Sequence, residues 1–191
     1  ETGKKETNMQ DSLRVGIAGL GTVGSGVAKI LLSNGHLIKS RCSRKIELTA
    51  ISSKSKSKKR GFPVEKFHWE ENLINLARRD DIDIFVELIG GEGNPAKEAI
   101  EVALNNGKHV VTANKALMAK HGHQLAKLAE NNGLSLKFEA AVAGGIPAIK
   151  TLTESLAGNK INRLMGVMNG TCNYILTRME NANLSYEKVF K

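Results

Sequence analysis

The chain has 191 residues, which is enough for one domain or for one domain and part of a second. Apolar residues make up 41% of it and charged residues 25%, a balance that excludes a fully disordered chain. The net charge is +9, but aromatic residues make up only 4%, and much of the excess charge is crowded into residues 54–60. A short cationic loop of this kind suits a small phosphate, so we expect neither a nucleic-acid nor a membrane partner.

The two cysteines, Cys42 and Cys172, are far apart in the sequence. They predict neither a disulfide framework nor a metal site and are typical of a reducing compartment, so we expect a cytoplasmic protein. The apolar runs are too short to cross a bilayer as helices. The first residues are polar and show no secretory signal, and residues 1–12 are expected to form a flexible tail.

Apolar runs and helical periodicities alternate along the rest of the chain. Strands are predicted at residues 13–18, 46–52, 82–89, 109–112, 134–138 and 161–168. Helices are predicted at residues 23–32, 72–78, 95–107, 122–131, 146–156 and 171–179. The alternation indicates an α/β fold with a Rossmann-type, doubly wound parallel sheet, which we assign to residues 13–145. Residues 146–191 are expected to begin a second, α+β domain.

The first predicted strand leads into a glycine-rich turn, Gly19-Leu20-Gly21-Thr22-Val23-Gly24. In such a G-x-G-x-x-G pattern the first glycine makes a tight turn and the second lets a pyrophosphate approach the backbone. The third glycine lets the following helix pack closely on the strand. The helix N-terminus adds partial positive charge for the phosphates. The turn therefore predicts a dinucleotide site at residues 19–24, and a packing turn without a ligand is the alternative.

The second predicted strand ends in Ser52 and Ser53, which Lys54 follows. A site for NAD usually has an acidic residue here, which binds the ribose hydroxyls. A carboxylate would repel a 2′-phosphate, whereas serine hydroxyls and a lysine would bind one. We therefore expect NADP as the preferred cofactor, with NAD possible. A solvated loop whose charges bind nothing is the alternative.

Later segments make the assignment more specific. They are VELIGG at residues 86–91, HVVTANKAL at 109–117, EAAVAGGIP at 139–147 and NGTCNYIL at 169–176. Together with the glycine turn, these motifs resemble the homoserine dehydrogenase family in order and spacing. The resemblance implies NAD(P)-dependent interconversion of L-homoserine and L-aspartate 4-semialdehyde, a step of threonine and methionine biosynthesis. It also implies a catalytic and dimerisation region after the nucleotide-binding domain, and a homodimer in the complete enzyme.

Lys115 follows the carboxyl end of a predicted strand, where ligands of open α/β sheets bind. In the family the matching lysine lies beside the nicotinamide ribose and the reacting carbonyl, so we assign Lys115 to both the cofactor site and the catalytic site. A surface lysine at a helix start is the alternative. The cofactor pocket is also expected to include Ile89, Gly90, Gly91, Thr112, Ala113 and Asn114.

The EAAVAGGIP segment has small residues where a strand gives way to a helix. Such a turn can aim several carbonyl oxygens at one point, as hard cations require. The resemblance implies a monovalent cation, sodium or potassium, at the positions of Glu139, Val142, Gly144 and Ile146. A tight packing turn without an ion is the alternative.

The NGTCNYIL segment places Asn169, Gly170 and Thr171 between a predicted strand and a predicted helix. Thr171 is expected to cap that helix, whose N-terminus would receive the substrate carboxylate. By resemblance, these three residues bind the substrate. The family's acidic substrate cluster and proton-donating lysine find no match up to Lys191, so we expect a fragment that is inactive alone.

Three other functions stay open at this point. The first is a catalytically inactive module that binds a dinucleotide without turnover. The second is another semialdehyde or amino-acid dehydrogenase of the same fold, although Cys172 lies in the wrong kind of motif for a catalytic nucleophile. The third is nucleic-acid binding through residues 54–60, which a salt-sensitive gel shift would test.

Overall fold

The computed structural model describes residues 12–167 and 169–190. The chain separates into two compact units between Ser155 and Leu156. Of the expected tail, residues 1–11 lie outside the described residues, and Ser12 already belongs to the first strand. The functional division expected between residues 145 and 146 stays a prediction.

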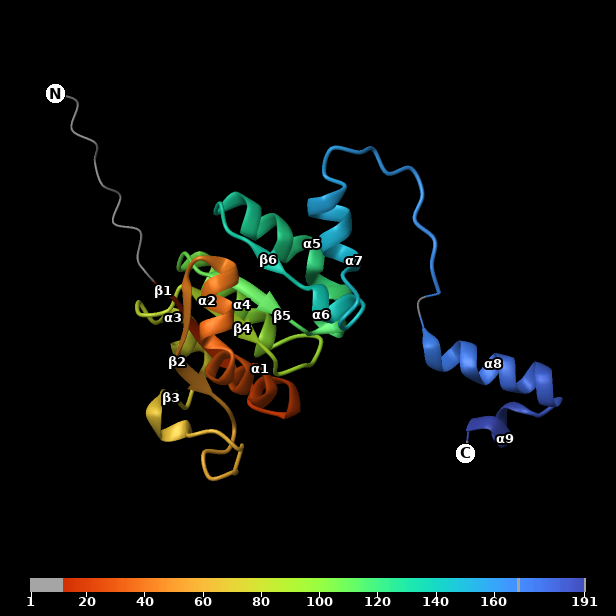
Figure 1. Ribbon diagram of the computed structural model, residues 1–191, viewed down its shortest axis with the longest axis horizontal. Coiled ribbons are helices and arrows are strands. Elements are labelled where there is room, and N and C mark those ends of the chain that lie inside the picture. The colour runs from red at the N-terminus through yellow and green to blue at the C-terminus, as the bar shows by residue number, and fades with distance from the viewer. Residues whose placement is uncertain (1–11, 168, 191) are drawn as a thin grey trace. The chain divides into compact units, whose positions relative to one another are not determined.

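The first unit is built on a six-stranded parallel sheet in the order β3-β2-β1-β4-β5-β6 (Figure 1). The strands are β1 (Ser12–Ala18), β2 (Lys45–Ser52), β3 (His68–Glu70), β4 (Ile84–Glu87), β5 (His109–Thr112) and β6 (Leu136–Lys137). This order confirms the predicted doubly wound α/β fold. The strand order reverses between β1 and β4, and open sheets of this class bind their ligands beyond the carboxyl ends of such strands.

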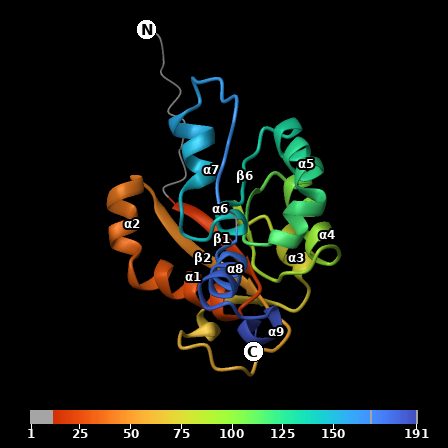
Figure 2. The same ribbon diagram turned by 90° about the vertical axis from the view of Figure 1, so that its right-hand side faces the viewer.

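Helices cover both faces of the sheet (Figures 1 and 2). On one face lie α1 (Thr22–Ser33) and α2 (Gly35–Cys42). On the other lie α3 (Leu73–Arg78), α4 (Ala96–Asn105) and α5 (Lys115–Asn131). The shorter helical segments are η1 (Val64–Lys66), α6 (Glu139–Val142), α7 (Ala148–Lys150) and the π-helical turn η2 (Thr151–Ser155).

Side chains that alternate along the strands form two apolar cores, one under each layer of helices. Phe85 and Val110 belong to the core with α3, α4 and α5, whereas Ile17 and Val86 belong to the core with α1. Successive strand residues point to opposite faces, so a strand covered on both sides needs an almost continuous apolar run. The packing therefore explains why the central strands read as such runs in the sequence.

Several elements of this unit differ from the predictions. Helix α5 begins at Lys115 and not near residue 122, because the Asn114 side chain caps it by accepting the Leu117 N–H at 3.1 Å. Gly35 was expected only to end a helix, yet it also begins α2. The edge strand β3 was not predicted, since three residues are too few to show a period. The predicted helix 146–156 forms only the short segments α7 and η2.

The second unit contains α8 (Gly170–Ala182) and α9 (Tyr186–Phe190). The predicted strand at 161–168 is wrong for residues 161–167, which run irregularly, and residue 168 lies outside the described residues. A strand needs a hydrogen-bonded neighbour, and the described part of this unit contains no other strand to pair with it. In the two described ranges, 12–167 and 169–190, none of the helices has both the length and the apolar character needed to cross a membrane.

Candidate cofactor and active site

The loops that follow β1, β2, β3 and β4 line a cavity of about 550 Å³ at the carboxyl edge of the sheet, and Glu71 lies on its wall. Three predicted segments meet there, namely the glycine turn, the end of β2 and the VELIGG turn. The predicted residues that line the cavity are Gly19, Leu20, Gly21, Ser52, Ser53, Lys54, Ile89, Gly90 and Gly91. The fold thus brings together residues as far apart in the sequence as Gly19 and Gly91.

The three glycines of the turn meet different surroundings. Gly19 has a φ of +96°, and a Cβ there would lie 2.5 Å from the Leu88 carbonyl oxygen. A Cβ on Gly24 would lie 1.8 Å from the carbonyl oxygen of Gly19, so helix and turn can pack only around a glycine. A Cβ on Gly21 would meet no other described atom within 4 Å. Gly21 therefore faces open space at the cavity, where a ligand can approach the backbone.

The start of α1 continues this surface. Gly21 is the N-cap, and no side chain of the described residues caps the helix there by a hydrogen bond. Thr22 and Val23 follow as exposed residues of the first turn. A helix start without a side-chain cap keeps backbone N–H groups available, and its dipole favours an anion. The predicted residues 22–24 thus form a suitable binding place for a phosphate.

The end of β2 is positioned by Arg60, which the sequence analysis had counted only as one charge of a cationic loop. Arg60 is buried, and its guanidinium donates to the carbonyls of Leu20 at 3.3 Å and Lys58 at 2.8 Å. It also donates to the Ser53 hydroxyl at 3.2 Å and lies over the Trp69 ring. Arg60 therefore fastens the loop after β2 to the glycine turn.

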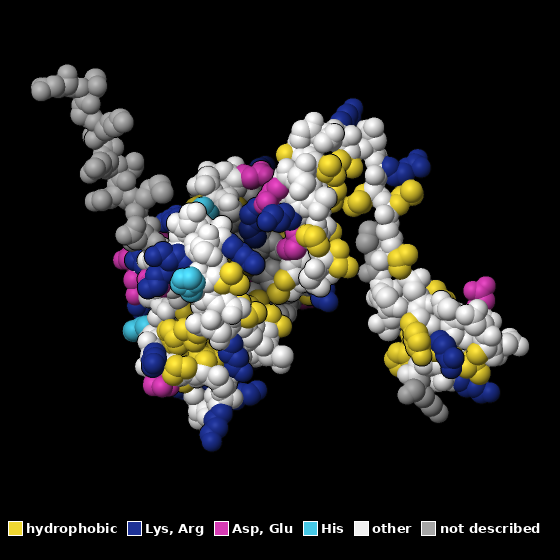
Figure 3. Space-filling view, viewed as in Figure 1, with side chains coloured by type: hydrophobic (Ala, Val, Ile, Leu, Met, Phe, Trp, Pro, Cys, Tyr) yellow, Lys and Arg dark blue, Asp and Glu magenta, His cyan; other side chains and the backbone are white. Residues whose placement is uncertain are grey.

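The lysines of the same loop face solvent. Lys54, Lys56, Lys58 and Lys59 are exposed, and dark blue side chains project from this loop in Figure 3. Lys54 lines the cavity next to the serines at the end of β2. The loop thus combines a buried arginine that holds its shape with exposed ammonium groups available to an anion.

A buried carboxylate, Glu87, lies beneath the opposite wall of the cavity. Its Oε1 accepts the backbone N–H groups of Ile89 at 2.8 Å and Gly90 at 3.1 Å. Its Oε2 accepts the Thr112 hydroxyl at 2.5 Å. The sequence analysis did not select Glu87, although a carboxylate inside an apolar strand run was a signal that could have identified it. A buried charge without partners costs several kcal/mol, so a residue of this type needs a dedicated set of donors.

The loop after β5 completes this arrangement. Asn114 donates its Nδ2 to the Gly91 carbonyl at 2.7 Å, and its backbone N–H donates to the Thr112 hydroxyl at 3.0 Å. Ala113 donates its N–H to the Glu87 carbonyl at 3.4 Å. Lys115 is the first residue of α5 and is exposed. The backbone that leads to Lys115 is therefore held by the same group of residues that shapes the VELIGG turn.

Lys115 lines a separate apolar groove of about 500 Å³ between α5 and α6. Met118, Phe138 and Val142 are among its other walls. Lys115 is not among the residues that line the 550 Å³ cavity. Lys115 thus borders an apolar groove and follows directly after the loop that holds the VELIGG turn.

Glu139, one of the four predicted cation positions, begins α6. Its carboxylate accepts the backbone N–H groups of Ile149 at 2.9 Å and Lys150 at 2.7 Å, so it caps the segment that includes α7. Among the described residues, no group of three or more His, Cys, Asp or Glu could hold a metal ion.

The other three cation positions lie around the turn between α6 and α7. Val142, Gly144 and Ile146 are all exposed, and Val142 is the last residue of α6. Gly144 has a φ of +46°, a left-handed conformation that favours glycine. The Ile146 carbonyl accepts the Ala148 N–H at 2.8 Å. These positions stay a prediction.

The three predicted substrate residues all lie at the start of α8 in the second unit. Asn169 is the N-cap and its side chain accepts the Cys172 N–H at 3.0 Å, so the expectation that Thr171 caps this helix was wrong. The Asx side chain reaches the N3 position, which is the usual geometry of such a cap. Gly170 and Thr171 form the exposed first turn.

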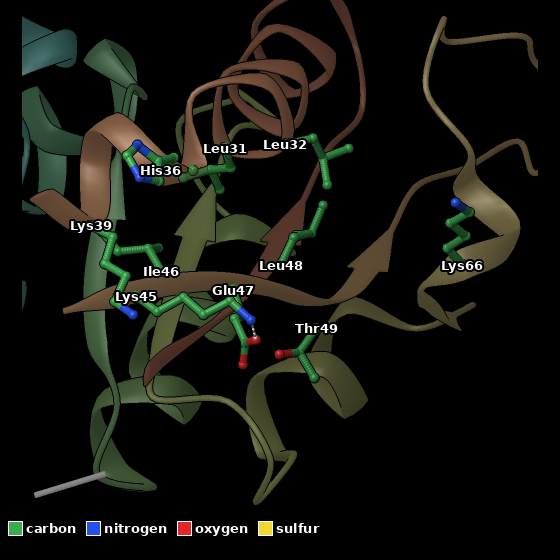
Figure 4. Close-up of a pocket in the computed structure, with 11 residues that line it drawn as sticks. Leu31, Leu32, His36, Lys39, Lys45, Ile46, Glu47, Leu48, Thr49 and Lys66 are labelled. Carbon is green, nitrogen blue, oxygen red and sulfur yellow. Dashed lines mark hydrogen bonds and ion pairs between the residues drawn. The ribbon is translucent and has the colours of Figure 1, made fainter. Parts of the chain in front are cut away.

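A larger depression, of about 780 Å³, lies between the end of α1, α2 and β2 (Figure 4). Lys45 and Glu47 on its wall pair with each other, and Lys39 is exposed. None of the predicted site residues, all of which the structure describes, lines this depression. Size alone therefore does not identify the site, and the smaller cavity at the glycine turn is the candidate.

Comparison with known families gives two matches. Residues 19–139 match the family described as "Homoserine dehydrogenase, NAD binding domain", and residues 147–191 match the family described as "Homoserine dehydrogenase". A homoserine dehydrogenase of Neisseria gonorrhoeae is 44% identical over 180 residues, which cover 94% of this chain and 41% of that protein. One of Bacillus subtilis is 40% identical over 180 residues, with the same two coverages of 94% and 41%.

Solved structures give the same result. The crystal structure of a homoserine dehydrogenase from Thiobacillus denitrificans matches with a TM-score of 0.80 and 41% identity, over 93% of this chain and 41% of that one. A homoserine dehydrogenase structure from S. aureus matches with a TM-score of 0.76 and 40% identity, over 93% of this chain and 41% of that one. The chain thus spans 41% of the length of these relatives.

Proposed function

The chain belongs to the homoserine dehydrogenase family, and from that premise we propose that it is the nucleotide-binding part of such an enzyme. The proposed reaction converts L-homoserine and NADP⁺ into L-aspartate 4-semialdehyde, NADPH and a proton, and it is reversible. The observation that carries the proposal is the open space at Gly21, which lies between a tight turn and the start of α1, where no side chain of the described residues caps the helix. A family match and a fitting site thus support the same ligand.

The residues of the cavity fit a dinucleotide. Gly21 leaves room for a pyrophosphate at the backbone, and the first turn of α1 offers it N–H groups. Ser52, Ser53 and Lys54 offer hydroxyls and an ammonium at the end of β2, and the carboxylate residue Glu71 that also lines the cavity follows β3 instead. We therefore propose NADP as the preferred cofactor, while NAD stays the second candidate.

Each group of residues has a proposed task in the reaction. When bound, the nucleotide supplies hydride transfer. The glycine turn binds the pyrophosphate, and the turn at Gly90 and Gly91 lets the nicotinamide half pass close to the backbone. The Lys115 ammonium donates a hydrogen bond to the substrate oxygen whose charge changes during the reaction. The start of α8, at residues 169–171, binds the substrate carboxylate.

Several finer properties complete the proposal. A monovalent cation at Glu139, Val142, Gly144 and Ile146 would have a structural role. The division between nucleotide-binding and catalytic parts falls between residues 145 and 146, the complete enzyme is a homodimer, and the protein is cytoplasmic. The last point is supported by the two cysteines, which are free and exposed in the structure.

Calorimetric titration of this 191-residue chain with NADP⁺ and NAD⁺ tests the proposal, with homoserine oxidation measured on the same sample. The decisive variant is Gly21→Ala, whose methyl group meets no described atom but would occupy the space proposed for the pyrophosphate. We expect Gly21→Ala to fold normally and to weaken NADP⁺ binding about tenfold or more. Gly26→Ala is the matched control, because a Cβ there also meets open space but lies outside the turn.

The outcomes separate the open alternatives. Binding without turnover supports a nucleotide-binding part that lacks the full catalytic set. Turnover would support the dehydrogenase activity and overturn the expectation that this chain is inactive alone. If neither nucleotide binds, or if Gly21→Ala binds as well as the unmodified chain, the proposed cofactor site is wrong.

A further inference from the structure

Glu87 is the most deeply buried carboxylate at the candidate site, with 0% of its surface exposed. It ends β4, directly before the VELIGG turn that lines the cavity. Its recorded side-chain donors within the described residues are two backbone N–H groups and one hydroxyl, all neutral. Both carboxylate oxygens are therefore engaged, and both by loops at the ligand edge of the sheet.

The hydrogen bonds around Glu87 close into a ring. From Glu87 the ring passes through the N–H of Gly90 and along the backbone to the carbonyl of Gly91. It continues through the side chain and N–H of Asn114 to the Thr112 hydroxyl, which donates back to Glu87. The loops after β4 and β5 are thereby tied together across the cavity wall, and Lys115 follows immediately after the ring.

The chemistry of this ring requires an acceptor that is not also a donor. A carboxylate has acceptor oxygens only, whereas an amide of the same size would turn an N–H₂ group toward one of the donors. The Thr112 O–H also needs an acceptor, and Glu87 Oε2 is the acceptor that it has. With glutamine the two backbone N–H groups can keep an acceptor, but an N–H₂ group in place of Oε2 leaves the Thr112 O–H without its acceptor, so the ring loses the charged hydrogen bond that closes it.

We propose that Glu87 is a positioning residue that fixes the nicotinamide side of the cofactor site and the start of α5 at Lys115 as one rigid element. The inference rests on the proposed function, since it assigns the two ends of the cavity to the two halves of the dinucleotide. The adenine half would bind at the glycine turn and the end of β2, which the ring does not include. Damage to the ring should therefore affect only one half of the ligand.

The test compares two probes on the 191-residue chain. NADP⁺ occupies both halves of the proposed site, and adenosine 2′,5′-bisphosphate occupies the adenine half only. The variants are Glu87→Gln and Thr112→Val, which each break the ring, and Thr112→Ser, which keeps the hydroxyl. Val110→Ala is the matched structural control, because Val110 is a buried core residue of β5 outside the ring.

We expect Glu87→Gln and Thr112→Val to weaken NADP⁺ binding about tenfold, because a hydrogen bond to a charged group is lost in each. Both should bind adenosine 2′,5′-bisphosphate within about twofold of the unmodified chain. Thr112→Ser should bind NADP⁺ as the unmodified chain does, because it keeps the hydroxyl. Val110→Ala should lower the melting temperature without changing the ratio of the two affinities. A changed ratio in Glu87→Gln and Thr112→Val therefore cannot come from a general loss of stability.

Two results would overturn the inference while leaving the cofactor site intact. One is unchanged NADP⁺ binding by both Glu87→Gln and Thr112→Val. The other is an equal loss of both probes, which would make Glu87 an ordinary structural residue. If the unmodified chain binds neither probe, the proposed function fails, and the inference fails with it.

Discussion

Two carboxylates interrupt the same apolar run, one at each end of β4, and they are satisfied in opposite ways. Asp83 lies just before β4 and meets the Arg14 guanidinium at 2.7 Å and 3.1 Å. It also accepts the Arg14 backbone N–H at 2.8 Å. Glu87 ends β4 and accepts hydrogen bonds from uncharged donors at the ligand edge. In the sequence alone, Asp83 and Glu87 look alike, because both are acidic residues within the apolar run predicted as one strand at residues 82–89.

The difference follows from what each edge of the sheet has to do. At the amino edge an ion pair closes the end of the sheet, and both partners are only partly exposed, at 26% for Arg14 and 22% for Asp83. At the carboxyl edge, the phosphates of the proposed ligand would compete with Glu87 for any cation paired with it. Neutral backbone donors satisfy the carboxylate and shape the loops without placing a paired cation in the site.

The largest effect should come from breaking the carboxyl edge at its tightest contact. Gly24→Ala places a Cβ 1.8 Å from a backbone carbonyl oxygen, which no side-chain movement can relieve. We expect a loss of more than about 4 kcal/mol of unfolding free energy, or no folded protein at all. Gly26→Ala, two residues further along α1, should instead add about 0.5–1 kcal/mol. Urea unfolding of both variants checks the contrast, and a stable Gly24→Ala would contradict the geometry of the turn.

The next effect concerns the amino edge. Asp83→Asn keeps the size of the side chain and removes its charge beside Arg14, so we expect a loss of about 2 kcal/mol of unfolding free energy. Affinity for NADP⁺ should not change, because the pair lies at the opposite end of the strand. Calorimetry and urea unfolding of the same sample measure both quantities. A clear fall in affinity with Asp83→Asn would break the proposed division between the two edges.

The same pair should also make the stability depend on pH. The hydrogen bond from Arg14 lowers the pKa of Asp83 below its unfolded value of about 3.9. A lowered pKa stabilises the fold above the unfolded pKa, and this stabilisation is lost as the pH falls through the folded pKa. The chain should therefore lose stability below about pH 4. Unfolding curves at a series of pH values should show a shallower acid slope for Asp83→Asn, and an identical slope would exclude this pair as a cause.

A smaller loss of unfolding free energy is expected from a change at Arg60, which is a buried cation at the carboxyl edge. Its charge is accommodated there because loop carbonyls accept its hydrogen bonds and it lies over the Trp69 ring. Arg60→Met keeps the aliphatic stem and should cost about 1 kcal/mol, since several carbonyls lose a donor. It should also reduce the preference for NADP⁺ over NAD⁺, because the loop that carries Ser53 loses its attachment to the glycine turn. Lys59→Met in the same exposed loop is the control. Equal effects of both variants would mean that only loop charge matters.

The sequence predicted the parallel sheet well because strands buried on both faces leave continuous apolar runs, and it predicted the glycine turn because its spacing is characteristic. Arg60 was missed because it looks like its lysine neighbours in the sequence. Glu87 does interrupt an apolar run, but its role depends on partners as distant as Thr112, which the sequence does not reveal. Helix α5 was predicted too short because its first turn depends on the Asn114 cap and not on apolar periodicity. The strand predicted at 161–168 shows that an apolar run alone does not supply a pairing partner.

The smallest expected effect tests whether the distance between two charges or the number of hydrogen bonds between them decides how much an ion pair stabilises the fold. Lys97 and Glu101 on α4 approach to 2.6 Å, which is closer than the 2.7 Å between Arg14 and Asp83. The Lys97 pair is joined by one ammonium hydrogen bond between positions i and i+4, whereas Asp83 accepts three hydrogen bonds from one arginine. Glu101→Gln should therefore cost only about 0.3 kcal/mol, and less in high salt. Urea unfolding could instead show the same loss of unfolding free energy for Glu101→Gln and for Asp83→Asn. In that case the Arg14–Asp83 pair would stabilise the fold through its charges alone, and the contrast between Asp83 and Glu87 would have no physical basis.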